Sequence, residues 1–196
     1  PDHLDARINR AGLLCELGQH DAARRDVDAG LALDPDNPHL RCLLGRLHAE
    51  SGEAARARDA YTAALNLDSG FAEAWASRGV AAFELGDVDA AIADLSHALD
   101  LTDDPTIRYN RATAYQAHRR WADAVDDLTA ALARGAEAPE VYLKRGTCLI
   151  ALGDPDRARD DLLRCVRLDA DQADDAIRLL PTLADVLAPV AGRTSP

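Results

Sequence analysis

The sequence predicts an all-α fold built as a series of antiparallel helix pairs, and three observations lead to it. Aromatic residues make up only 4% of the 196 residues, which disfavours sheets. The chain aligns with itself when it is shifted by 34 residues, the distance from Gly18 to Gly52. Each repeating unit carries apolar residues at helical spacing in two segments, such as Ile8, Ala11 and Leu14 in the first.

Columns of small residues define the repeat and its two helices. The first helix of a repeat ends at a residue with a left-handed backbone conformation, which is free of strain only in glycine. The column of residues at this position holds Gly18, Gly52, Gly86 and Gly153. In the fourth unit Arg119 takes this place. Another column lets paired helices approach closely: Ala23, Ala57, Ala91, Ala124 and Ala158. We therefore predict five repeats, at residues 4–37, 38–71, 72–104, 105–138 and 139–172.

The first residues fall on a turn rather than on a helix. Pro1 and Asp2 lie 34 residues before Pro35 and Asp36, which close the first repeat. We interpret the sequence as a fragment of a longer protein whose preceding repeat is missing, and a mature N-terminus in this column is the alternative. A missing helix predicts weak self-association through apolar surface exposed around three residues of the first repeat: Leu4, Ile8 and Leu14.

The residues after the fifth repeat do not complete a sixth. Residues 173–188 carry apolar side chains at helical spacing, which predicts a capping helix over the last repeat, kinked at Pro181. Residues 189–196 are predicted to form a disordered tail.

Composition excludes several classes of function. The net charge of −12 disfavours binding to nucleic acid and to anionic membranes, since both require a basic surface. No apolar run reaches the length of a membrane span. Four cysteines without a CxxC pair indicate free thiols in the core, which fits a reducing cytoplasm. We find no metal-binding or cofactor-binding motif and expect none of these groups.

Two charged columns change together along the repeats. First helices carry Arg10, Arg78, Arg111 and Arg145, with Leu44 in the second repeat. Second helices carry Asp26, Asp94, Asp127 and Asp161, with Ala60 in the second repeat. Because both charges are absent from the same repeat, we predict a structural Arg–Asp pair inside each of the other four. Ligand binding by the arginines is the alternative, although bidentate pairing suits a fixed contact between helices.

Together these columns resemble those of the tetratricopeptide repeat family, over residues 4–172. The chain departs from the family pattern at Arg119, which replaces the turn glycine, and in its closing proline, which survives only at Pro35. The resemblance implies a right-handed superhelical array, an α-solenoid, whose first helices line a concave groove. In the family this groove holds an extended or helical peptide.

The resemblance implies the groove, and the spacing of residues along the first helices indicates which side chains line it. Cys15 and Glu16 share the groove side of the first helix in the first repeat. The side chains predicted to bind a peptide are Ile8, Asn9, Cys42, Arg46, Val80, Phe83, Tyr109, Asn110, Thr113, Gln116 and Lys144. Phe83 and Tyr109 occupy no scaffold column, so they serve either as anchors for a partner or as packing for a neighbouring helix. The aromatic, amide and cationic groups centre the expected contact on repeats three to five.

Three carboxylates at the repeat spacing form an acidic ladder near the ends of the first helices: Glu16, Glu50 and Glu84. Either they attract basic side chains of a partner or they are merely solvated. A second family feature, the clamp that holds the C-terminal carboxylates of heat-shock chaperones, is matched in type at only two of five positions, Asn110 and Lys144. The other three positions are Ala76, Val80 and Glu140. The sequence therefore argues against binding of chaperone tails.

The function that these patterns favour is a noncatalytic module that binds a protein or peptide segment in its groove. Its partner is another protein or another domain of the same parent protein. The alternative is a sensor or regulatory array within a larger enzyme or transcription regulator, in contact with its own catalytic domain. Catalysis by this chain itself has no support, because the six histidines lie in unrelated columns and no catalytic motif occurs.

Overall fold

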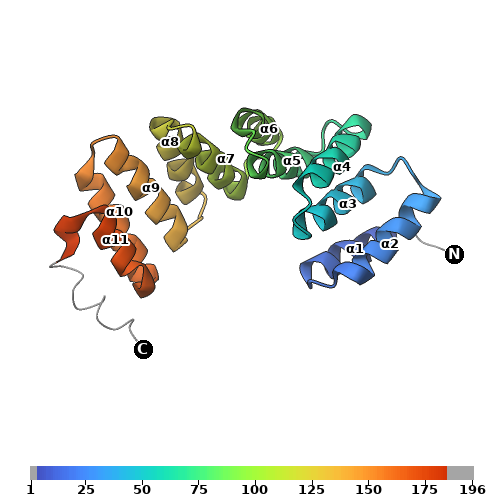
Figure 1. The fold of residues 1–196 in the computed structure, drawn as a ribbon, viewed down its shortest axis with the longest axis horizontal. Coiled ribbons are helices and arrows are strands. Elements are labelled where there is room, and N and C mark those ends of the chain that lie inside the picture. The colour runs from blue at the N-terminus through green and yellow to red at the C-terminus, as the bar shows by residue number, and fades with distance from the viewer. Residues whose placement is uncertain (1–3, 185–196) are drawn as a thin grey trace. The chain divides into compact units, whose positions relative to one another are not determined.

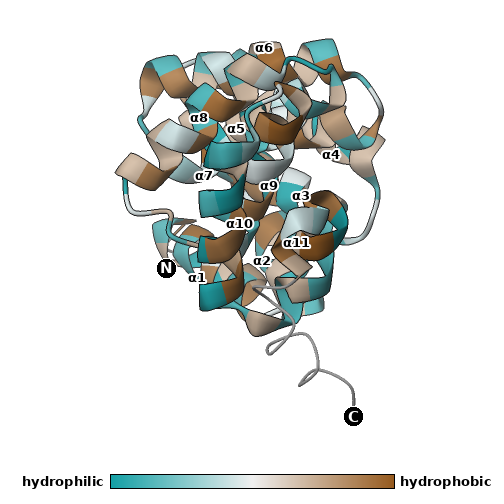
Figure 2. Ribbon diagram, turned by 90° about the vertical axis from the view of Figure 1, so that its left-hand side faces the viewer, coloured by the Kyte–Doolittle hydropathy of each residue, from teal (hydrophilic) through white to brown (hydrophobic). Residues whose placement is uncertain are grey.

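The computed structural model describes residues 4–184, and every regular element in this part of the chain is helical (Figure 1), so the predicted all-α class is confirmed. The chain forms two compact units, residues 1–103 and 104–196. Hydrophobic and hydrophilic residues alternate around the helices (Figure 2), as amphipathic helices require. None of the helices within residues 4–184 is long and apolar enough to cross a membrane.

The first unit consists of three helix pairs, in which the partners of each pair pack against each other. Its helices are α1 (Leu4–Glu16), α2 (His20–Leu33), α3 (Pro38–Glu50), α4 (Ala54–Leu67), α5 (Ala72–Glu84) and α6 (Val88–Leu101). Each pair falls within one of the ranges that the 34-residue offset marks.

The second unit consists of two such pairs and a terminal segment. Its helices are α7 (Pro105–Ala117), α8 (Trp121–Ala133), α9 (Pro139–Ala151), α10 (Pro155–Leu168) and α11 (Ala173–Leu179). Short 3-10 turns at Ala170–Gln172 and Pro181–Leu183 flank α11.

Helix α11, which follows the fifth repeat, stops just before Pro181, where the sequence predicts a kink. It ends at Leu179, because Pro181 has no N–H and pushes the preceding residue, Leu180, out of the helical conformation to φ −136 and ψ 88. Leu183 is nevertheless fully buried in the core cluster that covers α10. Residues 185–188 of the predicted helix, the turn at 1–3 and the tail at 189–196 lie outside the described residues.

The turn inside each repeat needs a left-handed residue. Gly18, Gly52, Gly86 and Gly153 have φ between 69 and 83, and Arg119 adopts the same conformation with φ 58. The following amide closes the turn in the same way in each case; Arg120 N–H donates to Tyr115 O at 2.8 Å, and Asp154 N–H donates to Leu149 O at 2.9 Å. The arginine therefore preserves the turn, at a strain of about 1–2 kcal/mol.

Small residues let the two helices of a repeat approach closely. A Cβ atom added to Gly45 on α3 would lie 2.6 Å from the ring of Tyr61 on α4. Tyr61 is in turn part of a core that reaches the next repeat, because it packs with Ala74 and Ala81 of α5. Helix α4 therefore contributes to the core of its own repeat and to the interface with the next one.

The first repeat exposes different residues from those predicted. Leu4, Ile8 and Leu14 are half-buried, since they pack against the core formed by Ala11, Val27 and their neighbours. Leu13, which points away from this core, is instead 55% exposed.

The structure brings together all four Arg–Asp pairs. In each pair the arginine Nε and Nη2 donate to the two carboxylate oxygens, at distances between 2.6 and 2.8 Å. The four aspartates are buried, with exposed fractions of 4–8%. The hydrogen bond from Arg10 lowers the pKa of Asp26 below its usual value. These bidentate contacts join the two helices of a repeat at a fixed angle and register.

Breaking and deleting one of these pairs should have different consequences. Arg145→Leu leaves Asp161 charged, buried and without its partner, and should lower the free energy of unfolding by about 3 kcal/mol or more. The double variant Arg145→Leu with Asp161→Ala copies the second repeat, which has Leu44 and Ala60, and should recover most of the loss. Urea unfolding of both variants measures the difference, and equal destabilisation would contradict the structural role of the pair.

Candidate functional site

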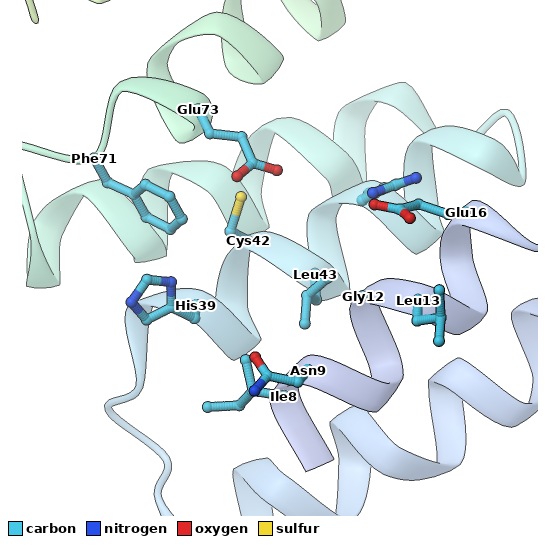
Figure 3. Close-up of a pocket in the computed structure, with 11 residues that line it drawn as sticks. Ile8, Asn9, Gly12, Leu13, Glu16, His39, Cys42, Leu43, Phe71 and Glu73 are labelled. Atoms are coloured by element: carbon cyan, nitrogen blue, oxygen red, sulfur yellow. The ribbon is translucent and has the colours of Figure 1, made fainter. Parts of the chain in front are cut away.

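The first helices of the first unit line a cavity of about 380 Å³ (Figure 3). The lining residues are Ile8, Asn9, Gly12, Leu13 and Glu16 from α1, His39, Cys42, Leu43 and Arg46 from α3, and Phe71 and Glu73 from the start of α5. The cavity therefore opens on the side of the repeats that sequence reasoning selected as the groove, and it contains the predicted residues Ile8, Asn9, Cys42 and Arg46.

Helical geometry explains why these residues meet. Ile8, Gly12 and Glu16 recur every four positions, so they share one face of α1, and Cys42 and Arg46 do the same on α3. Gly12 lies at the centre of this face and has no side chain to fill the cavity. A Cβ atom added there would meet no other atom within 4 Å, so the glycine leaves open space rather than relieving a clash.

Charges in the cavity are only partly neutralised. Arg46 Nε donates to Glu50 Oε1 at 3.1 Å, and His20 Nδ1 lies 2.7 Å from Glu50 Oε2. Glu16 and Glu73, in contrast, form no ion pair within residues 4–184. The lining thus presents two unpaired carboxylates and one guanidinium that already shares its charge with Glu50, which favours a cationic group in the cavity.

The acidic ladder is not a set of equivalent groups. Glu16 lines the cavity, Glu50 is held by Arg46 and His20, and Glu84 is exposed at the end of α5. Glu16 is therefore the one residue of the ladder that is available to a ligand of this cavity. The second unpaired carboxylate of the lining belongs to Glu73, which is not part of the ladder.

Phe71 is a lining residue that the sequence prediction missed. It precedes α5 and its ring meets that of His39 edge to face, with the ring centroids 4.9 Å apart. The equivalent residue of the previous repeat is Asn37. The replacement of this small polar residue by a large aromatic one was the sequence signal that could have identified Phe71. The prediction also missed Leu13, His39 and Glu73, because these side chains enter the cavity from the edges of their helices.

The cysteines belong to the core. Cys15, predicted to face the groove, is 3% exposed and packs with Ala11 and Ala23, because its helical position points toward α2. Cys42 contributes to the cavity wall but is also 3% exposed, and burial raises the pKa of its thiol to about 12. A thiol with this pKa is a poor nucleophile at neutral pH.

The second unit has its own recess beside Tyr109. This recess, of about 460 Å³, is lined by Pro105, Thr106 and Tyr109 of α7, by Glu140 and Val141 of α9, and by residues of the preceding loop. Lys144 Nζ lies 5.1 Å from the centre of the Tyr109 ring and 3.4 Å from Gln116 Oε1. Burial lowers the pKa of Lys144.

The remaining predicted residues lie on the expected helices but outside these two cavities. Val80 and Phe83 are half-buried on α5, and Asn110 and Thr113 are half-buried on α7. Thr113 Oγ1 donates to Tyr109 O at 2.9 Å, so its hydroxyl is used within its own helix. The joint use of Phe83 and Tyr109 as anchors stays a prediction.

Comparison with known families identifies the repeat. A family model described as tetratricopeptide repeat matches residues 42–104 and 109–175. The chain belongs to the tetratricopeptide repeat family. Members of this family are generally noncatalytic interaction modules, and the α-solenoid class expected from the sequence agrees with the solved structures of tetratricopeptide repeat proteins that the chain resembles.

Individual relatives share the repeat at low sequence identity. Human DnaJ homolog subfamily C member 3 is 26% identical over 187 residues, which cover 87% of this chain and 37% of the relative. The chain thus spans little more than a third of that tetratricopeptide repeat protein.

Among solved structures, pilF of Pseudomonas aeruginosa has a TM-score of 0.84 at 21% identity, covering 96% of this chain and 87% of pilF. YrrB, a tetratricopeptide repeat protein with an unusual peptide-binding site, has a TM-score of 0.73 at 17% identity, covering 88% of this chain and 89% of YrrB. At these identities the likeness shows the fold alone.

Among the residues that the structure describes, no group of three or more His, Cys, Asp or Glu side chains is placed to hold a metal ion. The four cysteines are free and buried. The polar side chains that line the cavity can recognise a ligand by charge and hydrogen bonding.

The buried thiols should be inert in the native protein. Burial raises the pKa of Cys42 to about 12 and those of Cys148 and Cys165 to about 11. At pH 8 a thiol-specific reagent should therefore label the folded chain about a hundredfold more slowly than the same chain in urea. Mass spectrometry of the labelled peptides measures each site, and fast labelling of Cys42 in the native protein would contradict the assigned burial.

Proposed function

We propose that this tetratricopeptide repeat array binds an extended segment of a partner protein in the cavity formed by α1, α3 and α5. The observation that carries the proposal is the cavity itself, whose lining combines apolar, amide and charged side chains on the groove side of three successive repeats. The sequence centred the contact on repeats three to five, whereas the cavity favours repeats one to three.

The lining indicates the chemistry of the segment. Ile8, Leu43 and Phe71 offer apolar contact for one side chain, and burying such a side chain is worth roughly 1.5–3 kcal/mol. Glu16 and Glu73 add two carboxylates without a partner in the described chain. A segment that places a lysine or arginine next to an apolar residue satisfies both features.

The source of the segment separates the two functions that the sequence left open. An interaction module binds a segment of another protein, whereas a regulatory array binds a segment of its own parent enzyme or transcription regulator. YrrB supports peptide binding as a use of this fold. The unpaired carboxylates are equally compatible with both sources, because they specify only the charge of the segment.

Filling the cavity should weaken binding without disturbing the fold. Gly12→Leu adds a side chain where space is open and replaces glycine by a better helix former, so stability should be kept or raised. Peptides selected from a random display library on the native chain serve as the probe, and Gly12→Leu should weaken their binding about tenfold or more. The matched control is Ala93→Leu, at an exposed position of α6. Equal binding by both variants would place the site elsewhere.

Removing the cavity carboxylates should weaken binding and its dependence on salt. The variant Glu16→Gln with Glu73→Gln should lose about tenfold in affinity for selected basic peptides, since two attractive charges are removed. The control variant Asp100→Asn with Asp160→Asn changes net charge equally on exposed positions of second helices. Calorimetric titration at two salt concentrations compares them. An identical loss in both would mean that only the overall negative charge attracts the peptide.

A further inference from the structure

The recess beside Tyr109 in the second unit has a counterpart in the first unit. Residues 105–141 align with residues 38–74, two repeats earlier. In both stretches a hollow is lined by the start of one first helix, the loop that ends the same repeat and the start of the next first helix. Glu140 takes the place of Glu73 in this alignment. Both sites therefore contain the same carboxylate, and the side chains around it decide what else each site can hold.

The two sites differ in the aromatic side chains that they contain. In the first unit Phe71 packs against the core cluster that includes Cys42, and its ring meets that of His39 edge to face (Figure 3). In the second unit Ala138 replaces Phe71, and Thr106 replaces His39. The recess of about 460 Å³ is therefore open at the place where the first unit holds an aromatic side chain of its own.

The walls of the recess are suited to an aromatic ring. Pro105, Ala136 and Val141 supply apolar surface. Tyr109 is half-buried and contributes a ring at the position that Cys42 has in the first unit. Because aromatic side chains prefer edge-to-face or offset contacts with one another, a second ring in the recess would find both an apolar wall and an aromatic partner.

Glu140 is the charged lining residue that has no partner. It is exposed and forms no ion pair within residues 4–184. Arg134, the other charged residue of the lining, donates from Nη1 to Ala130 O at 3.0 Å, at the end of its own helix. Burial raises the pKa of Tyr109, and the charge of Glu140 raises it further, so the carboxylate acts on this ring. A cationic group beside Glu140 is therefore complementary to the recess.

We propose that the recess beside Tyr109 binds one aromatic side chain of a partner protein, from a segment in which a lysine or arginine stands next to the aromatic residue. The ring packs against Tyr109 in the space that corresponds to Phe71 of the first unit, and the cation pairs with Glu140. The proposal does not rest on the cavity of the first unit, because the recess lies within the second unit and shares no residue with that cavity.

The aromatic residue comes from another protein rather than from this chain. Every Phe, Trp and Tyr of the sequence lies within residues 4–184, and none of them is exposed. Residues 185–196 contain no aromatic residue. Neither a second copy of the chain nor its own C-terminal residues can therefore supply the ring without the unpacking of a helix or a turn.

A short peptide tests the site directly. The probe acetyl-Gly-Phe-Lys-Gly-amide, titrated into the isotope-labelled chain, should shift the NMR signals of backbone amides in residues 134–141 saturably, with a dissociation constant of about 1 mM or lower. The same peptide with alanine in place of phenylalanine should bind about tenfold more weakly. No saturable shift in this range, or equal binding of the two peptides, would overturn the proposal.

A variant that fills the recess tests where the ring binds. Ala138→Phe gives the second unit the side chain that the first unit has in this place, so the fold should be kept. Binding of the phenylalanine peptide should weaken about tenfold, with an unchanged or raised free energy of unfolding in urea. The matched control Ala122→Phe adds the same ring at an exposed position of α8 and should bind the peptide normally. Equal binding by the two variants would contradict the assigned site.

The ion pair is tested by a second pair of variants. Glu140→Gln should weaken binding of the lysine peptide about threefold or more and leave the binding of acetyl-Gly-Phe-Gln-Gly-amide unchanged, since only the first peptide carries the cation. The control Asp126→Asn changes the net charge equally at an exposed position of α8 and should affect neither peptide. The same loss for both peptides in Glu140→Gln, or the same loss in both variants, would overturn the proposed pairing with Glu140.

Discussion

Within each unit, the packing of a second helix against the first helix of the next repeat is the contact on which the rest of the structure depends. In the first unit, α4 places Tyr61, Ala64 and Leu65 in one core with residues of its partner α3 and of the following α5. A single helix pair cannot enclose this stripe, since one side of it faces away from the pair. Neighbouring repeats therefore stabilise one another, and each unit holds together as a stack.

This stacking leaves several residues on the opposite side of the first helices outside the core, at the surface of the cavity. Contacts of α3 with α1 and with α5 bring the first helices of successive repeats together. Residues on that side, such as Asn9 and Arg46, can then vary without loss of the fold, and they surround the cavity. The scaffold thus fixes where a ligand can bind, while the exposed lining fixes which chemistry it meets.

The Arg–Asp pairs connect the packing within a repeat to the packing between neighbouring repeats. Each pair fixes the angle within a repeat, and the third nitrogen of Arg78 or Arg145 reaches the preceding repeat through a threonine. The second repeat lacks both charges and still forms the same helix pair, α3 with α4. The pairs therefore fix the angle between two helices whose packing apolar burial already stabilises. This agrees with the small net contribution that buried ion pairs make to the free energy of folding.

The sequence by itself determined the helix pairs, the turn residues and the partners of the charged columns. These features depend on local spacing and on strict periodicity; the joint absence of arginine and aspartate from the second repeat was enough to predict Arg10 with Asp26 and its three equivalents. Only the tertiary structure decided which residues meet across repeats. Cys15 turned into the core, Leu13 faced outward, and Phe71 and Glu73 entered the cavity from the start of α5. A rotation of a few tens of degrees about a helix axis separates a groove position from a core position, and the packing of the neighbouring repeat sets that rotation.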